Sequence, residues 1–209
     1  MNEPWLRGND ALTTDKEIRE AFLRKKLSRL RAQHDTLIVE ELGLVNATAR
    51  VDIAVLNGCL HGFEIKSGRD TLDRLPEQLE VYSGSLEKLT IVCAERHLGP
   101  VRKMAPDWAG LVQATRGPRG GVYFEVIRRA NRNPEASPEL IAHLLWRAEA
   151  AEVLARFNEA APVLRRPRAE LYRRLGQLMT TGELTAVARQ FMLKRQDWRS
   201  DLLSMSYAG

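Results

Sequence analysis

The sequence predicts an α/β fold, in which helices flank a mixed sheet and a small all-α domain follows. Short strand-like runs alternate with helical patterns in the first part of the chain. Within that part, residues 60–94 run strand, helix, strand, an order typical of a crossover between two parallel strands. Residues 131–138 are rich in Asn and Pro, which favours a linker, and the pattern beyond them is helical throughout. We therefore predict a core at residues 1–130, a linker at 131–138 and a helical C-terminal domain at 139–209.

The composition fits a folded chain with a buried core. Hydrophobic residues make up 44% of the 209 positions, which excludes the disordered, collagen and coiled-coil classes. Lys and Arg number 32 against 27 Asp and Glu, so the net charge is +5, an excess compatible with a polyanionic partner. The sequence has no apolar run of membrane-spanning length, and its first ten residues lack the pattern of a signal peptide. We therefore expect a cytoplasmic protein without a membrane partner.

The first expected helix covers residues 15–31, where apolar side chains recur at helical spacing with basic side chains between them. Asp15 lies where a helix N-cap is expected, and Thr13 or Thr14 could serve equally. The pattern then changes to strand-like runs. Six such runs are expected, at residues 36–42, 50–56, 60–66, 89–94, 111–115 and 122–127.

A hairpin and further helices complete the expected elements. Asn57 and Gly58 separate the second and third runs, as in a tight hairpin. Residues 70–86 regain a helical pattern, with Pro76 tolerated if the regular part begins close to it. Beyond the linker, apolar residues at helical spacing predict helices near residues 140–145, 171–178 and 183–194.

Charged side chains of the second and third strand-like runs are the candidates for chemistry. Asp52 lies inside one run, and Glu64 and Lys66 lie two positions apart on the next, so the latter two share one face of the sheet. Unpaired charge is costly to bury, and a divalent metal ion held by Asp52 and Glu64 would balance it. Hard carboxylate oxygens suit Mg²⁺, with Mn²⁺ as the alternative. The simpler alternative is a hairpin whose solvated face carries ordinary salt bridges.

This grouping resembles the PD-(D/E)xK, or restriction-endonuclease-like, nuclease superfamily, in which an acidic residue on one strand precedes Glu-x-Lys on the next. Gln78 and Tyr82, four residues apart on the following helix, resemble the Gln-x-x-x-Tyr element of its RecB-like branch. Glu40 and Glu41 precede Asp52 where the family has its first acidic residue, and we prefer Glu41. The chain looks most similar to a group of uncharacterised bacterial proteins with an appended helical tail.

The resemblance implies a restriction-endonuclease-like fold and a metal-dependent nuclease that hydrolyses phosphodiester bonds. DNA is the expected substrate, in repair, recombination or defence against mobile DNA. The resemblance also implies that Lys66 orients the attacking water or offsets the charge that builds on the phosphate, and that Gln78 and Tyr82 brace the site or contact the phosphate backbone. The expected metal ligands, direct or through water, are the side chains of Asp52, Glu64 and Glu41 and the carbonyl of Ile65.

The hairpin register decides whether a site with two carboxylates can form. A two-residue hairpin loop would place Asp52 opposite Phe63, and Asp52 and Glu64 would then point to opposite faces of the sheet. The site therefore requires a three-residue connection, or a bulge at Gly58 or Gly62.

A cluster of arginines beyond the linker is the candidate nucleic-acid-binding surface, because guanidinium groups suit phosphate contacts that ignore base sequence. The alternative is a solvated helix face. The cluster consists of Arg165, Arg166, Arg168, Arg173 and Arg174.

Two other functions stay open. The chain could be a non-catalytic nucleic-acid-binding or adaptor protein that keeps a nuclease-like fold, and metal binding would separate it from an enzyme. It could instead be a structural protein whose helices form a bundle with a partner, in which case binding would be insensitive to salt. A homodimer or a protein partner would then be held through the C-terminal helices.

Overall fold

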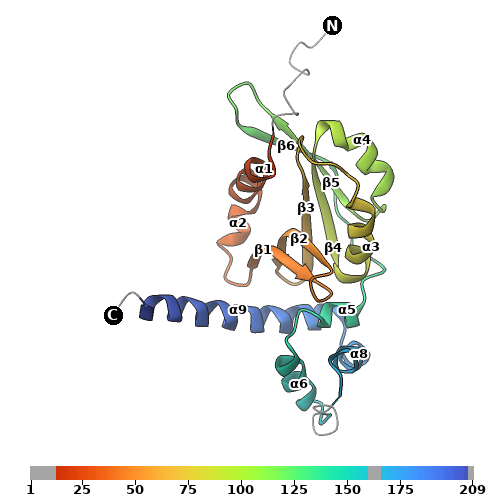
Figure 1. Cartoon of the computed structure of the whole chain (residues 1–209), viewed down its shortest axis with the longest axis vertical. Helices are drawn as coiled ribbons and strands as arrows, with labels where there is room; N and C mark the ends of the chain where they lie inside the picture. Colours follow the sequence, from red (N-terminus) through yellow and green to blue (C-terminus); the bar gives the residue numbers. More distant parts are fainter. Residues whose placement is uncertain (1–12, 160–165, 207–209) are drawn as a thin grey trace.

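A mixed sheet forms the centre of the structure, in which α-helices lie on both of its faces (Figure 1). The computed structural model describes residues 13–159 and 166–206, and within these ranges six strands form one sheet in the order β1-β2-β3-β4-β5-β6. The strands are β1 Leu37–Leu44, β2 Ala49–Leu56, β3 Leu60–Lys66, β4 Lys88–Ala94, β5 Gly110–Arg116 and β6 Val122–Arg128. The predicted mixed α/β fold is confirmed. Each expected strand begins and ends within two residues of the bounds of an observed strand.

The strand connections explain why the sheet is mixed. The first three strands pair antiparallel, as do the last two, whereas β3–β4 and β4–β5 pair parallel. Each parallel pair is joined through a helix, α3 (Leu75–Ser85) or α4 (Glu95–Met104). The predicted crossover between β3 and β4 is thus confirmed. The second crossover was not expected, because Gly99 and Pro100 lie inside α4 and favour a break in the sequence pattern.

The two faces of the sheet carry different apolar clusters. The first helical segment consists of α1 (Asp15–Phe22), a π-helical turn η2 (Leu23–Leu27) and α2 (Ser28–Arg31), and it packs Ile18 and Phe22 onto one face. Thr14 caps α1 and forms a capping box with Glu17, so Thr14 rather than Asp15 is the N-cap. On the opposite face, α3 buries Leu75, Leu79 and Tyr82, whose spacing of four and three residues keeps them on one side of the helix.

The C-terminal helices lie at one end of the sheet (Figure 1). They are α5 Pro138–Ala142, α6 Arg147–Ala155, α8 Arg168–Leu178 and α9 Thr181–Ser206. One apolar cluster runs without a break from the sheet and α3 into these helices. The segment at 131–138 is also tied down, because the Asn133 amide donates to the carbonyls of Ser83 and Leu86, each at 2.7 Å. The division into a core and a separate helical domain stays a prediction.

None of the helices in the described part of the chain combines the length and apolar character needed to cross a bilayer.

Candidate functional site

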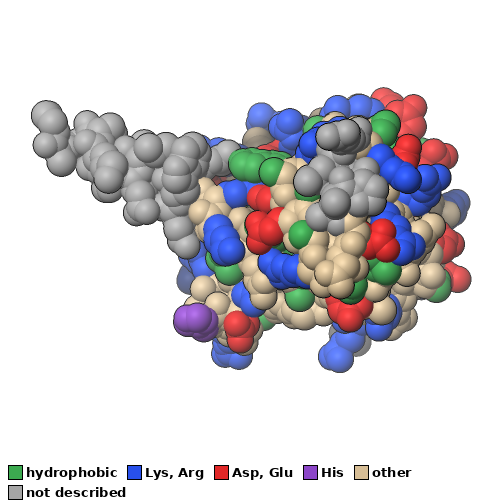
Figure 2. Space-filling model, turned by 90° about the horizontal axis from the view of Figure 1, so that it is seen from below, with side chains coloured by type: hydrophobic (Ala, Val, Ile, Leu, Met, Phe, Trp, Pro, Cys, Tyr) green, Lys and Arg blue, Asp and Glu red, His purple; other side chains and the backbone are tan. Residues whose placement is uncertain are grey.

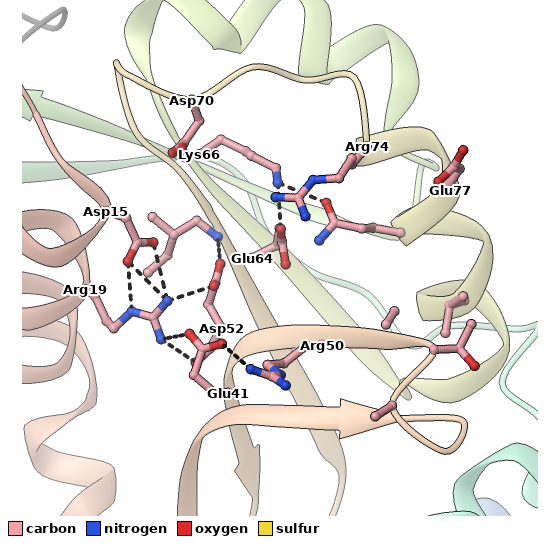
Figure 3. Close-up of a pocket in the computed structure, with 16 residues that line it drawn as sticks. Asp15, Arg19, Glu41, Arg50, Asp52, Glu64, Lys66, Asp70, Arg74 and Glu77 are labelled. Carbon is pink, nitrogen blue, oxygen red and sulfur yellow. Dashed lines mark hydrogen bonds and ion pairs between the residues drawn. The ribbon is translucent and has the colours of Figure 1, made fainter.

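A pocket of about 580 Å³ opens where α1, the β1–β2 hairpin and the start of α3 meet beside β3 (Figure 3). It gathers charged side chains from parts of the chain that lie far apart in sequence. Six carboxylates and four cations line it: Asp15, Arg19, Glu41, Arg50, Asp52, Glu64, Lys66, Asp70, Arg74 and Glu77. The candidate residues Asp52, Glu64, Lys66, Glu41 and Gln78 all line this pocket, and Tyr82 contacts Glu64 beneath it.

The register between β2 and β3 places the two central carboxylates together. Leu56 pairs with Leu60 and Ile53 pairs with Phe63, so continuation of this register sets Asp52 opposite Glu64. The strands are joined by a three-residue connection at residues 57–59, in which Gly58 has a φ of 82°. The expected three-residue connection is confirmed. Asp52 and Glu64 therefore share one face of the sheet.

Arg19 is the main side-chain partner of Asp52. Its guanidinium donates to Asp52 Oδ1 at 2.8 Å and to the Asp52 carbonyl at 3.1 Å. The other carboxylate oxygen, Oδ2, accepts from the backbone N–H of Ile65 at 2.6 Å. The same guanidinium also forms ion pairs with Asp15 and Glu41, so one cation from α1 serves three carboxylates (Figure 3).

Glu64 is held by a second set of donors. Lys66 Nζ lies 2.8 Å from Glu64 Oε1, and the Tyr82 hydroxyl donates to Glu64 Oε2 at 2.6 Å. Lys66 also donates to Gln78 Oε1 at 2.9 Å, and the Gln78 amide lies 3.3 Å from the Tyr82 hydroxyl. Gln78 and Tyr82 thus belong to the site and are not ordinary helix surface.

Of the two upstream glutamates, Glu41 reaches the pocket. Glu40 pairs with Ile53 in the β1–β2 ladder and is absent from the pocket lining, whereas Glu41 lies opposite Asp52. The backbone of Glu41 is left-handed, with a φ of 55°, which interrupts the ladder at this point. A non-glycine residue in this left-handed conformation destabilises the fold by on the order of 1 kcal/mol, because its Cβ lies too close to the following carbonyl oxygen.

The sequence pattern does not single out Arg19 as the central cation of the site. Arg19 was only one of seven basic residues in the first helix. A usable signal was its position directly after the buried Ile18, at the border of the apolar face of α1. A basic side chain at that border faces the sheet rather than bulk solvent.

Burial sets the protonation of two groups in the pocket. Burial raises the pKa of Asp52 to about 7, and Glu64 acts in the same direction, while the Ile65 N–H and Arg19 oppose the rise. Burial, followed by the charge of Glu64, raises the pKa of the Tyr82 hydroxyl well above its ordinary value. Tyr82 therefore stays protonated and able to donate to Glu64.

The carboxylates as arranged do not fit a bound Mg²⁺ or Mn²⁺. Each of the four carboxylate oxygens of Asp52 and Glu64 already accepts from a donor of the chain itself. A cation would have to displace Arg19 and Lys66 from them. Among the described residues, no cluster of three or more His, Cys, Asp or Glu side chains has the geometry of a metal site.

The expected arginine cluster does not join this pocket. Arg165 lies outside the described residues, and the other members lie on or just before α8, at the far end of the fold. Arg166 pairs with Glu170 at 3.1 Å, and Arg174 pairs with Glu159. Seen from this end, basic side chains alternate with acidic ones and form no single patch (Figure 2). Nucleic-acid contact by Arg168 and Arg173, which are exposed, stays a prediction.

Comparison with known proteins decides the family. The family described as bacteriophage P4 protein cII matches residues 9–207. The chain belongs to the bacteriophage P4 protein cII family. Protein cII of Enterobacteria phage P4 is 32% identical over 124 residues, which are 59% of this chain and 47% of that protein. The match thus spans about half the length of this cII relative.

A solved protein of unknown function from Silicibacter pomeroyi shares a weaker likeness with this cII-family chain. The TM-score is 0.44 at 20% sequence identity, over 71% of this chain and 93% of the other. A likeness at this level carries no conclusion about fold or function.

Membership of the cII family overturns the family expected from the sequence. The assignment to the PD-(D/E)xK superfamily, and to uncharacterised bacterial proteins within it, is wrong, and so is the metal-dependent DNA nuclease inferred from it. The physical reason lies in the motif itself. Asp, Glu-x-Lys and Gln-x-x-x-Tyr are common polar residues, and here they form a closed set of ion pairs and hydrogen bonds that stabilises the pocket.

Proposed function

We propose that this cII-family chain is a nucleic-acid-binding protein without catalytic turnover, which keeps a nuclease-like arrangement of strands and polar side chains. The observation that carries the proposal is the occupation of the central carboxylates by Arg19, Lys66, Tyr82 and the Ile65 N–H. A hydrolytic site needs carboxylates that are available to a metal ion or to water. Here, the carboxylates are engaged in holding α1 and α3 against the sheet.

Exposed cations of the first helical segment support the nucleic-acid-binding part of the proposal. In the part of the chain that the structure describes, these side chains form no ion pair with an acidic residue. They are Arg24, Lys26, Arg29 and Arg31. Because phosphate contacts by such side chains are independent of sequence and release counterions, the binding should weaken steeply as salt rises.

The test measures binding and cleavage in one experiment. Labelled single-stranded, duplex and branched oligonucleotides are incubated with the full chain in Mg²⁺ or Mn²⁺, with EDTA and the Lys66→Ala variant as controls. We expect salt-sensitive binding and intact oligonucleotides under every condition. Cleavage that both EDTA and Lys66→Ala abolish would overturn the non-catalytic part, and lack of binding at low salt would overturn the rest.

Metal binding gives an independent measurement. Binding of Mg²⁺ or Mn²⁺ at Asp52 and Glu64 stays a prediction of the motif, and it would require Arg19 and Lys66 to move. Isothermal titration calorimetry of the wild type and of Asp52→Asn is the discriminating comparison. Heat that the substitution removes would indicate a metal site, whereas equal titrations support a pocket that is closed by the cations of the chain.

An adaptor role is the second candidate, and exposed aromatic side chains support it. Trp146 and Phe157, at the two ends of α6, are 56% and 42% exposed. Aromatic side chains are enriched where proteins bind each other. A homodimer or a protein partner held through these helices should resist salt, so size-exclusion chromatography at low and high salt separates this role from nucleic-acid binding.

A further inference from the structure

A second, smaller groove lies on the sheet face that α1 covers, between η2 and the end of β6. Its volume is about 260 Å³. The floor is apolar and aromatic, formed by His61 and Phe63 of β3 together with Val112 and Val126. The rim is basic, formed by Lys26, Lys88, Arg128 and Arg129, and no acidic residue lines the groove.

The aromatic floor is ordered by ring contacts. The His61 ring stacks on Phe63 with centroids 4.2 Å apart and planes 27° apart, and Phe22 lies 5.2 Å from Phe63. His61 Nε2 also bonds to the Thr90 hydroxyl at 2.9 Å, which fixes the ring. Burial, aided by Lys88, lowers the pKa of His61 to about 4. At neutral pH the imidazole is therefore uncharged, and the floor stays free of charge.

The rim keeps most of its cations available. Arg128 is fixed by hydrogen bonds to the carbonyls of Ala109 and Pro106, at 2.7 and 2.8 Å. Lys26, Lys88 and Arg129, by contrast, form no ion pair with any acidic residue that the structure describes. An uncharged floor bordered by unpaired cations is complementary to a ligand with an apolar body and flanking negative charges.

We propose that this groove receives one base of a single-stranded nucleic acid, with the adjoining phosphates on Lys26, Lys88 and Arg129. The proposal rests on the proposed nucleic-acid-binding function and names its substrate class. A base in a duplex is stacked and paired, so only an unpaired base can present its face to a recessed floor. A groove below the ~300 Å³ of typical ligand clefts suits one base of a longer chain rather than a whole small molecule.

The larger pocket is the less suitable phosphate site. Six carboxylates line it against four cations, so its field repels a phosphate, whereas the groove exposes cations alone. Charge therefore directs a polyanion to the β6 side of the sheet.

The phosphate contacts are tested by anisotropy of a fluorescein-labelled 12-mer of deoxythymidine with the full chain over a range of salt. The double variant Lys88→Ala/Arg129→Ala removes two rim cations. Its matched control, Arg102→Ala/Lys103→Ala, removes two exposed cations of α4 on the opposite face. We expect the rim variant to lower the slope of log affinity against log salt by about 1.4, because each single-strand phosphate contributes about 0.7. We expect the control to leave this slope unchanged.

Base entry is tested with an abasic 12-mer, which keeps the phosphates and lacks the bases, and with the corresponding duplex. The wild type should bind the thymidine strand more tightly than either. A peptide of ten glutamates should compete poorly, because it offers charge without a planar base. Circular dichroism spectra matching the wild type would establish that the variants are folded.

The outcomes separate the two proposals. If the wild type binds no oligonucleotide, the proposed function itself fails. If it binds but the rim and control variants behave alike, the groove is not the site and the function stands. Equal affinity for the abasic strand or the duplex, or strong competition by the acidic peptide, would overturn base entry and leave a general polyanion surface.

Discussion

The Thr185 hydroxyl in α9 donates to a buried carboxylate oxygen of Glu87, beside the start of β4, at 2.8 Å and across 98 residues of sequence. Glu87 also accepts from the backbone N–H of Leu60 at 2.8 Å and from the Thr181 hydroxyl at 3.0 Å. One carboxylate thus joins the hairpin end of β3 to the start of α9. This buried bridge adds to the packing of Leu184, Ala188 and Phe191, which also attach α9 to the core.

Replacing Thr185 by Val should loosen this attachment. Val keeps the shape of Thr but leaves a buried carboxylate oxygen short of one donor, and a hydrogen bond to a charged group contributes about 1.5–3 kcal/mol. We expect Thr185→Val to lower the free energy of unfolding in urea by about that amount. Thr71→Val, at an exposed position, is the control and should change it little. Equal effects of the two substitutions would show that the Glu87 bridge adds no stability.

The fold should be sensitive to the loss of Arg19. Its loss leaves Asp15, Glu41 and Asp52 without their shared partner. Of the three, only Asp52 is largely buried, and removal of one member of a buried ion pair costs about 3–5 kcal/mol. We expect Arg19→Met to destabilise the fold by this order, with a smaller effect in the double variant Arg19→Met/Asp52→Asn. Arg24→Met, an exposed cation of the same helical segment, is the control. Additive single effects in the double-mutant cycle would contradict a direct pair between Arg19 and Asp52.

The strands and their register could be predicted from the sequence because they follow from short-range rules. Alternation of period two indicates which side chains share a face, and the requirement that Asp52 and Glu64 meet predicts a three-residue connection or a bulge. The structure shows the connection, at residues 57–59. By contrast, α4 was not expected, since Gly99 and Pro100 disfavour a helix locally. The packing of His97 and Val101, both buried, stabilises it there. Tertiary packing decides such elements.

The site could be predicted in position but not in chemistry. Asp52, Glu64 and Lys66 come together as strand alternation and the required register indicated, and Gln78 and Tyr82 join them as the resemblance implied. Their partner does not follow from local pattern, because Arg19 reaches Asp52 across 33 residues. The same five residue types can hold a metal ion or satisfy one another, and only the three-dimensional placement of a nearby cation distinguishes these cases.

Two helical glycines should respond to alanine in opposite ways. A Cβ at Gly176 in α8 would lie 2.8 Å from the backbone nitrogen of Glu139 in α5, so the two helices would have to separate. We expect Gly176→Ala to destabilise by about 1–3 kcal/mol, as overpacking does. Gly182→Ala in α9 meets nothing within 4 Å and should stabilise by about 0.5–1 kcal/mol through helix propensity. Thermal unfolding of both variants checks this, and destabilisation by both would contradict the open space at Gly182.

Stability should fall as pH rises through the range in which Asp52 ionises. In the unfolded chain this carboxyl has a pKa near 3.8, whereas burial raises its folded-state pKa to about 7. Between these values the unfolded chain loses the proton while the folded chain keeps it, so rising pH favours unfolding. At roughly 1.36 kcal/mol per pKa unit, the loss from pH 4 to pH 7 is at most about 4 kcal/mol.

Asp52→Asn removes this titration, so the stability of the wild type relative to the variant should decline from pH 4 to pH 7 and level off above it. Urea unfolding of both proteins at several pH values measures the difference. Asp107→Asn, at an exposed position, controls for the loss of one negative charge. The opposite result, a wild type that becomes more stable relative to Asp52→Asn as pH rises, would contradict this prediction. It would show that the guanidinium of Arg19, rather than burial, controls the pKa of this carboxyl, and that Asp52 is ionised in the folded pocket at neutral pH.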